Sequence, residues 1–546
     1  MAASCPLRRS VTTGVAALIA ATVLPSATAA AHTPAVPHVL LLSVDGMHQA
    51  DLVRYVAAHP RSALAALVRR GASFTHAQTP LPTDSFPGMV GQVTGGHPRT
   101  TGIYYDVSYD HALLPAGTTE CSGSPALGAP INDDESADLD SSRLDAGQGL
   151  AGLPGSILSM TGTPVSLLNA GSFPIDPVTC TPVLPHSQLR VNTIFEVARA
   201  HGLRTAWSDK HAAYDVLQGP SGAGIQDLFT PEINSDTGEG TDWTGENAKT
   251  QQYDGYKTRA VLNQIDGLDH SGTRRVGAPS LFGMNFQSVS TAEKLPSSGG
   301  RAGGYAADGT TPGPVLASAL AFVDRQVGLM LRELKDRHLD KSTTIILSAK
   351  HGQSPTDPGA LLRVPDGPIL DGLDEAWAAI HPGAAPLVAS ATNDDAMIIW
   401  LSDRSGTATD FAKDYLLGHD GTGNDIHGNP KPYRSSGLQH VYAGTDAAAF
   451  FGTAPADSRV PDLYATAQHG VVFTGKKGKI AEHGGADPQD RNVPLVISGP
   501  EVHRASTSEA VETTQIAPTI LRLLGLDPQA LRAVRIEHTV TLPLDD

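Results

Sequence analysis

Short apolar runs alternate with helical patterns along most of the chain. Residues 38–44 are almost entirely apolar and lead to Asp45 and Gly46, which predicts a strand buried on both faces. Further strands are predicted at 204–208, 281–287, 343–348 and 493–498. Helical periodicity predicts helices at 52–58, 63–70, 86–93, 192–200, 315–334 and 514–524. This alternation is typical of an α/β fold in which helices sandwich a mostly parallel sheet.

Two stretches do not follow this alternation, at about 104–190 and 355–465. Both are rich in Gly, Pro, Asp and Ser. We expect them to be insertions that form a cap over the carboxyl ends of the strands, within one domain spanning 32–546. Ligands of open α/β sheets bind at these strand ends. The polar residues that follow predicted strands are therefore the first candidates for a site.

Composition indicates a large folded protein with many turns and loops. The 546 residues include 56 Gly and 40 Pro, with 40% hydrophobic and 17% charged residues. The net charge of −17 disfavours binding to a nucleic-acid duplex. The phosphate-binding motifs GxGxxG and GxxxxGK(S/T) do not occur, which argues against a nucleotide-cofactor enzyme of those kinds. No sequence signal sets the oligomeric state.

Residues 1–31 have the pattern of a secretory leader. Arg8 and Arg9 precede an apolar run at 15–24, and Ala27-Thr28-Ala29 fits a cleavage site. A buried first helix is the alternative, which Pro25 disfavours because it interrupts the helical face. We therefore expect an exported protein. The later sequence has no run of about 18 apolar residues that would predict a membrane span.

Two cysteines, Cys121 and Cys180, remain once the leader is removed. An even number of cysteines in an oxidising compartment predicts one disulfide. Two free buried thiols are the alternative, which the surrounding Gly, Ser, Pro and Thr disfavour.

The strongest local signal is the segment from Pro82 to Gly88. Ser85 precedes a predicted helix that has Pro87 in its first turn. Backbone N–H groups at a helix start favour an anion, so the Ser85 hydroxyl is placed to attack phosphorus. The alternative is that Ser85 only caps the helix, which is the commonest role of serine there.

Several motifs occur together in one order, and together they resemble a known family. This order of motifs is similar to the nucleotide pyrophosphatase/phosphodiesterase branch of the alkaline phosphatase superfamily, which implies an alkaline-phosphatase-like fold. The motifs are Val44-Asp45-Gly46, Pro82-Thr83-Asp84-Ser85-Phe86-Pro87, Val93-Thr94-Gly95, Gly309-Thr310-Thr311-Pro312-Gly313-Pro314, Ile345 to Gly352, His483-Gly484 and Ile516-Ala517-Pro518-Thr519.

The resemblance implies two divalent metals, usually zinc, that flank the phosphate. Asp45, Ser85 and His351 match ligands of the first metal, but Lys350 stands where the family has an aspartate. His483 matches a ligand of the second metal. The two other ligands of that metal, an Asp and a His, correspond to Gln287 and Thr310, and the Asn that often follows Phe-Pro corresponds to Gly88.

These departures change the chemistry that the site can perform. A protonated lysine cannot bind a metal, so we expect Lys350 to neutralise a phosphate oxygen in place of one ion. Asp45, His351 and Ser85 remain as ligands for one divalent ion, with zinc as the expected metal, or His351 acts as an acid or base. Gln287 is able to donate a hydrogen bond to an oxyanion.

Three other polar groups have weaker signals. Lys210 and His211 follow a predicted strand and are expected to line the anion pocket, with a solvated loop pair as the alternative. Asp308 is either a replacement ligand or, more simply, a turn residue before Gly309. The pair 394–395 is either a paired-acid site or the start of a strand.

The sequence therefore predicts an exported hydrolase of small phosphate diesters or pyrophosphates that forms a covalent intermediate on Ser85. One alternative is an anion-binding relative that has lost catalytic metals. Another is a hydrolase of a different anion, such as a sulfate ester or a phosphonate. The Cys-x-Pro-x-Arg segment of ordinary sulfatases is absent, which argues against that class.

Overall fold

The computed structural model describes residues 11–12, 14, 37–123, 126–474 and 478–544. Almost all of the predicted leader, its cleavage site included, lies outside the described residues. The described residues from 37 onwards form one compact unit.

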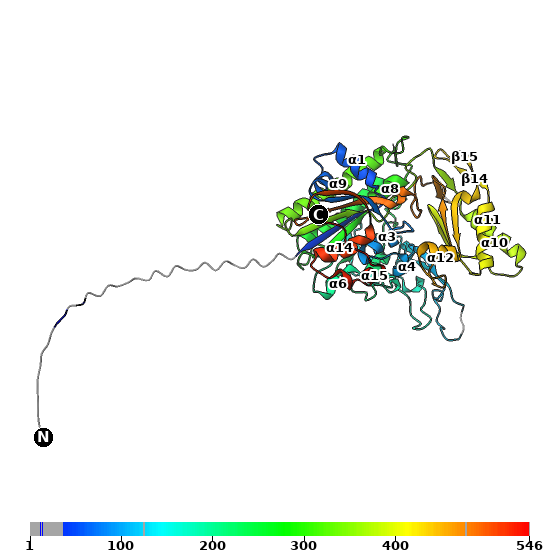
Figure 1. The fold of residues 1–546 in the computed structure, drawn as a ribbon, viewed down its shortest axis with the longest axis horizontal. Helices are drawn as coiled ribbons and strands as arrows, with labels where there is room; N and C mark the ends of the chain where they lie inside the picture. Colours follow the sequence, from blue (N-terminus) through cyan, green and yellow to red (C-terminus); the bar gives the residue numbers. More distant parts are fainter. Residues whose placement is uncertain (1–10, 13, 15–36, 124–125, 475–477, 545–546) are drawn as a thin grey trace, which may run out of the picture. The chain divides into compact units, whose positions relative to one another are not determined.

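An eight-stranded sheet lies at the centre of this unit, in the order β20-β2-β19-β10-β1-β7-β5-β6 (Figure 1). The strand β1 (His38–Val44) pairs in parallel with β10 (Thr343–Ser348) and β7 (Leu281–Phe286). The short strands β5 (Trp207–Ser208) and β6 (Leu228–Phe229) continue the parallel arrangement. This mostly parallel sheet confirms the predicted fold class.

One strand of the sheet is antiparallel to both of its neighbours. The strand β19 (Asn492–Ser498) pairs antiparallel with β10 and with β2 (Ala72–Gln78), and β2 pairs in parallel with the edge strand β20 (Ala505–Glu512). The sequence predicted the position of β19 within one residue, but the pattern did not show its direction.

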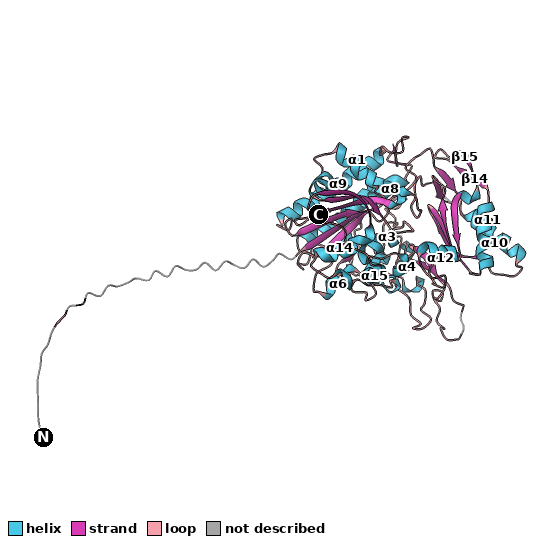
Figure 2. Ribbon diagram, in the orientation of Figure 1, coloured by secondary structure: helices cyan, strands magenta, loops and turns pink. Residues whose placement is uncertain are grey.

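Helices cover both faces of the sheet (Figure 2). Alternate residues of β1 point to opposite faces. Val39 and Leu41 belong to a core formed with α3 (Ser85–Thr94), α6 (Ile194–Ala200) and α14 (Ile516–Leu523). Leu40 and Leu42 belong to a second core, formed with α1 (Gln49–Ala58), α2 (Ala63–Arg70), α7 (Asn247–Ile265), α8 (Ser288–Lys294) and α9 (Pro314–Asp336).

The stretch predicted as a second insertion forms two smaller sheets with a core of their own. The antiparallel sheet has the order β12-β13-β17-β16, and the other has the order β15-β14-β11-β18. The elements of this region are β11 (Leu362–Val364), α10 (Gly367–Ile380), β12 (Val388–Asn393), β13 (Ala396–Leu401), α11 (Gly406–Gly418), β14 (Gly421–Asn424), β15 (Pro430–Tyr433), β16 (Leu438–Ala443), α12 (Thr445–Phe451), β17 (Leu463–Ala467) and β18 (Val471–Phe473).

The stretch predicted as the first insertion consists mainly of turns and short 3₁₀ helices around the hairpin β3 (Val107–Asp110) and β4 (Ala129–Asn132). Cys121 and Cys180 form a disulfide across it, which confirms the predicted pairing. The boundaries of both insertions stay predictions. The remaining short elements are α4 (Pro98–Thr101), α5 (Pro185–Gln188), β8 (Ser297–Ser298), β9 (Arg301–Ala302), α13 (Pro488–Arg491) and α15 (Arg532–Glu537).

The helix α9 is, in the described part of the chain, the one helix long and apolar enough to cross a membrane by length and composition. Its apolar residues, among them Val315, Leu320 and Val327, pack in the core beneath the sheet. The core helix of a folded protein has this same composition, so the finding is weak evidence for a span.

Candidate active site

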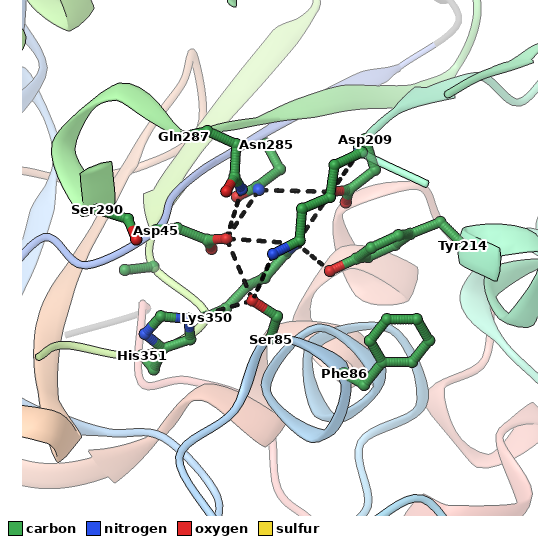
Figure 3. A network of polar contacts seen from close by, with 12 residues as sticks. Asp45, Ser85, Phe86, Asp209, Tyr214, Asn285, Gln287, Ser290, Lys350 and His351 are labelled. Carbon is green, nitrogen blue, oxygen red and sulfur yellow. Dashed lines mark hydrogen bonds and ion pairs between the residues drawn. The ribbon is translucent and has the colours of Figure 1, made fainter. Parts of the chain in front are cut away.

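The carboxyl ends of three neighbouring strands carry most of the predicted site (Figure 3). Asp45 follows β1, Gln287 follows β7, and Lys350 and His351 follow β10. These strands are hydrogen-bonded neighbours in the sheet, so the residues that leave them lie together. The start of α3 brings Ser85 to the same place.

Ser85 is the first residue of α3 and is 1% exposed. The N-cap of α3 is Asp84, whose side chain accepts a hydrogen bond from the Phe86 N–H at 2.9 Å. The alternative in which Ser85 only caps the helix is therefore wrong. The Ser85 hydroxyl is free to face the strand ends.

Three side chains surround the Ser85 hydroxyl oxygen. Oγ lies 3.3 Å from Oδ2 of Asp45, 3.2 Å from Nε2 of His351 and 3.4 Å from Nζ of Lys210. A glycine at 88 permits this close approach, because a Cβ there would lie 2.3 Å from the carbonyl oxygen of Lys350. The asparagine that the family often has at this position would require the backbone after β10 to move.

His351 is set up to accept the Ser85 proton. Its Nδ1 lies 2.9 Å from the carbonyl oxygen of Gly352, so Nδ1 carries the hydrogen and Nε2 presents a lone pair to Ser85. Burial lowers the pKa of His351 to about 4, which keeps the ring neutral at neutral pH. A neutral Nε2 in this position is able to act as a base or as a metal ligand.

Asp45 is held ionised by the groups around it. Its Oδ2 accepts hydrogen bonds from Nε2 of Gln287 at 2.6 Å and from Nδ2 of Asn285 at 3.1 Å. Burial opposes ionisation, but the charge of Lys350, the charge of Lys210 and the Gln287 hydrogen bond outweigh it and hold the pKa of Asp45 well below its usual range. Oδ1 of Asp45 is buried without a hydrogen-bond partner.

Lys350 is fully buried between two carboxylates. Its Nζ lies 3.0 Å from Oδ1 of Asp209, 2.6 Å from the hydroxyl of Tyr214 and 3.7 Å from Oδ2 of Asp45. Burial lowers the pKa of Lys350, and both carboxylates oppose that shift. Figure 3 shows the ammonium between Asp45 and Tyr214.

Lys210 is the lysine whose ammonium contacts the Ser85 hydroxyl. Burial opposes its charge, but Asp45 and then Asp106 outweigh this effect and raise the pKa of Lys210. Its neighbour His211 turns away, with Nδ1 2.7 Å from Oε2 of Glu232. The structure therefore brings Lys210 to the anion site and leaves His211 out of it.

His483 reaches the site from the loop before α13. Its ring centroid lies 4.0 Å from that of His351, and its Nδ1 lies 3.4 Å from the Tyr105 hydroxyl. Potential ligand atoms of His483, Glu482 and Asp394 lie within 4.8 Å of one another, so this group is a candidate metal-binding cluster. A second such cluster, formed by His48, Asp51 and Glu293, lies apart from Ser85.

The segment around Thr310 does not join these residues. The carbonyl oxygen of Thr310 accepts a hydrogen bond from Arg54, and its N–H donates to Oδ1 of Asp308. Asp308 is exposed and also accepts from Thr311, so its side chain organises a turn. The turn interpretation of Asp308 is thus the one that the geometry supports.

Two of the carboxylate ligands that the resemblance implies are absent from this site. Lys350 occupies the place of one carboxylate ligand, and the amide of Gln287 donates to Asp45 instead of offering a carboxylate. The remaining first set, Asp45, Ser85 and His351, has its atoms 3.2 and 3.3 Å apart and one orphaned oxygen, Oδ1 of Asp45. Ligand atoms of a tetrahedral zinc site with bonds of ~2.0 Å lie about 3.3 Å apart.

Sequence reasoning missed three members of the site, which are Asp209, Tyr214 and Asn285. Asp209 directly follows β5 and Asn285 lies near the end of β7, so the strand-end rule would have found both. Tyr214 lies in a 3₁₀ turn with no signal in its local sequence.

Comparison with known proteins shows which structures this chain resembles. No curated protein sequence matches the chain significantly. Among solved structures, murine ectonucleotide pyrophosphatase/phosphodiesterase 5 is similar, both alone and as an inactive variant in complex with AMP, with 14% identity and a TM-score of 0.53, covering 90% of this chain and 96% of that chain. Human ectonucleotide pyrophosphatase/phosphodiesterase 5 is also similar, with 14% identity and a TM-score of 0.51. The match covers 90% of this chain and 95% of that chain.

These structural similarities show the fold alone. Membership of a family is shown by a separate match to a family model. The type I phosphodiesterase/nucleotide pyrophosphatase family matches residues 39–489, which is most of the chain and includes every residue around Ser85 described above. The motif order in the sequence predicted the same branch of the alkaline phosphatase superfamily. This chain belongs to the type I phosphodiesterase/nucleotide pyrophosphatase family.

Proposed function

We propose that this chain is an exported hydrolase of small phosphate diesters or pyrophosphates that works through a covalent intermediate on Ser85. Membership of the family supports phosphodiester hydrolysis. The observation that carries the finer proposal is the buried Ser85 hydroxyl, which lies between the lone pair of His351 and the ammonium of Lys210. A serine with an adjacent base and an adjacent cation is the arrangement that nucleophilic attack on a phosphate requires.

In the first step the Ser85 oxygen forms a bond to phosphorus while its proton moves to Nε2 of His351. The bond from phosphorus to the leaving oxygen breaks. In the second step water attacks phosphorus of the resulting serine phosphodiester, which still carries the second ester group of the substrate, and His351 returns its proton to the Ser85 oxygen. The proton that the attacking water loses balances the one that the leaving group takes up, so the net reaction is hydrolysis.

Lys210 and Lys350 supply positive charge at two different places in the site. The Lys210 ammonium is placed to contact phosphoryl oxygens on a group attached to Ser85, because it lies 3.4 Å from Oγ. Lys350 adds positive charge beside Asp45, where the resemblance implies a metal, and its contacts with Asp209 and Tyr214 keep it fixed. Gln287 donates a hydrogen bond to Asp45 and so orients that carboxylate, while its hydrogen bond to an oxyanion stays a prediction.

A single divalent ion, expected to be zinc, would be held by Asp45, Ser85 and His351. When bound, it would lower the pKa of the Ser85 hydroxyl and attract phosphate oxygens. The mixture of one nitrogen and two oxygen donors suits zinc. With the ion bound, Nε2 of His351 would serve as a ligand of the ion in place of its role as the base.

The substrate class follows from the family and from one neighbour. The inactive variant of the murine relative was solved with AMP, which supports a nucleotide-type ester or pyrophosphate as the substrate here. Two alternatives stay open as outcomes of the test. They are an anion-binding relative without turnover and a hydrolase of sulfate esters or phosphonates.

The test uses the secreted chain and measures bound metals together with turnover. Bis(p-nitrophenyl) phosphate is compared with p-nitrophenyl sulfate and with a p-nitrophenyl phosphonate. We expect the phosphodiester to be preferred, Ser85→Ala to abolish turnover, and peptide mass analysis of the quenched wild type to detect a p-nitrophenyl phosphoryl group on the Ser85 peptide. The matched control is Ser73→Ala. It also removes a buried hydroxyl, but that hydroxyl, unlike the one of Ser85, has no hydrogen-bond partner.

Each result separates the candidates. Near-normal turnover of Ser85→Ala would refute the covalent mechanism. Phosphate binding without turnover of any ester would favour the anion-binding relative, and faster turnover of the sulfate would favour the other hydrolase. A chain retained in the cytoplasm of its host would refute export.

Lys210→Ala tests the anion pocket separately from the chemistry. Because Lys210 is the ammonium beside Ser85, its loss should weaken the binding of inorganic phosphate by about tenfold or more, measured by calorimetry. The control is Lys249→Ala, since Lys249 pairs with the exposed Glu239. Equal phosphate affinity in both variants would show that the anion does not contact Lys210.

A further inference from the structure

A polar cavity is lined by residues that follow His351 and His483 closely in the chain, among them Ser354 and Ala486. It has a volume of about 170 Å³, and Ser354, Asp395 and Asp490 are among its lining residues. Asp490 is fully buried, and neither of its carboxylate oxygens has a hydrogen-bond partner. Oδ1 of Asp395 is also buried without a partner, while its Oδ2 accepts from the Ser354 hydroxyl at 2.9 Å.

Among the described residues neither carboxylate forms a salt bridge, although the charge of His48 acts on Asp490. Within the described residues, no ion pair joins Asp395 or Asp490 to a lysine or an arginine, whereas the neighbouring Glu482 pairs with both Lys294 and Lys479. Such a pair must either share a proton or bind a cation.

We propose that a calcium-class divalent cation binds between Asp395 and Asp490. The unpartnered atoms are all carboxylate oxygens, the hard donors that calcium prefers, and the Ser354 hydroxyl lies beside them. A Cβ on Gly485 would lie 2.5 Å from Oδ2 of Asp490 and 2.8 Å from the carbonyl oxygen of Asp395, so the glycine leaves these oxygens open to one shared space. The cavity has room for the ion and for the waters that complete its coordination.

The position of this cation links it to the candidate active site. The N–H of Gly352 donates to the carbonyl oxygen of Asp490 at 2.7 Å, and the N–H of Asp395 donates to that of His483 at 2.9 Å. An ion that joins the two aspartates therefore joins the segments that present His351 and His483. The cation has a positioning role, and its binding does not depend on the proposed hydrolysis.

The test measures calcium binding and thermal unfolding of the full secreted chain after treatment with a chelator. Calcium chloride at about 1 mM should raise the melting temperature of the wild type, and calorimetry should find a site that Asp490→Asn weakens by about tenfold or more. Asp395→Asn should act in the same way. The matched control is Asp410→Asn, an exposed acid on α11, which should keep the full response to calcium.

Three results would overturn the proposal. The first is a melting temperature of the wild type that calcium does not change. The second is a calcium response that survives in both Asp490→Asn and Asp395→Asn, because the ion would then bind elsewhere. The third is a chelated Asp490→Asn variant that is more stable than the wild type with calcium, which would identify the pair as carboxyls that share a proton.

Discussion

Replacing Lys350 with an uncharged side chain of similar length should cost the fold more than an ordinary surface change. In the folded chain this ammonium is fully buried and contacts Asp209, Asp45 and the hydroxyl of Tyr214. Lys350→Met keeps most of the packing but leaves two buried carboxylates without their cation. Removing one partner of a buried ion pair costs about 3–5 kcal/mol.

The upper half of that range is the expected loss for Lys350→Met. Two carboxylates, at 3.0 and 3.7 Å, lose the same cation, and the Tyr214 hydroxyl loses a donor at 2.6 Å. We therefore expect a free energy of unfolding lower by about 4 kcal/mol at neutral pH. The loss should be smaller at acidic pH, where Asp45 accepts a proton in the variant because the cation that lowers its pKa is gone.

The free energy of unfolding of the wild type and of Lys350→Met is measured by denaturant unfolding at several pH values. The matched control is Lys341→Met, which removes an exposed lysine and should change stability by no more than about 0.5 kcal/mol. The double variant Lys350→Met with Asp209→Asn should recover part of the loss, because it removes one of the stranded charges. Equal stability of Lys350→Met and Lys341→Met would refute the buried ion network, whatever happens to turnover.

Two further predictions concern pH and the disulfide. Burial opposes protonation of His97, but its hydrogen bonds to Glu512 and Glu537 outweigh it and raise the pKa of His97 to about 9. A raised pKa gives stability that is complete below pH 6.5 and is lost as pH rises through 9. His97→Gln should therefore lower the free energy of unfolding by about 2 kcal/mol at pH 6 and by much less at pH 10, and an equal deficit at both would contradict this. The disulfide from Cys121 to Cys180 closes a loop with a sequence separation of 59, so Cys121→Ser should cost about 4 kcal/mol in the loop-entropy model. Non-reducing mass spectrometry should show the linked peptides, and free thiols in the secreted protein would contradict the bridge.

Local patterns predicted the elements whose buried apolar residues follow one regular period along the chain. The helix α2 and the strand β10 begin and end where the sequence predicted them, and α9 differs by at most two residues at either end. The edge strand β20 and its neighbour β2 were missed. Side chains of β20 are mostly exposed and polar, so the run Ala505–Glu512 has no apolar pattern to detect.

The long helix α7 was missed for a related reason. Its sequence is polar on average, and several of its buried residues, such as Asp254 and Lys257, are charged. These two form a buried ion pair, and Asp254 accepts hydrogen bonds from the N–H groups of Gln287 and Ser288. A buried polar face has no hydrophobic periodicity, so only the folded structure identifies it as a core helix.

The sequence by itself determined the alternation of strands and helices, the strand ends that carry Asp45 and His351, and the family to which the order of motifs belongs. These features depend on residues close together in the chain, since burial periodicity and turn chemistry are local properties. The serine before a helix and the cysteine pair were also visible at this level.

The tertiary structure decided which distant groups share one environment. Lys350 meets Asp209 across 141 residues of chain, and Asp395 and Asp490 come to one cavity from two different segments. Whether a lysine faces an anion or a carboxylate, and whether a buried acid keeps its charge, depends on such neighbours and not on its own sequence. Pairing between strands and the desolvation of charges are set by contacts far apart in the chain, which no local pattern records.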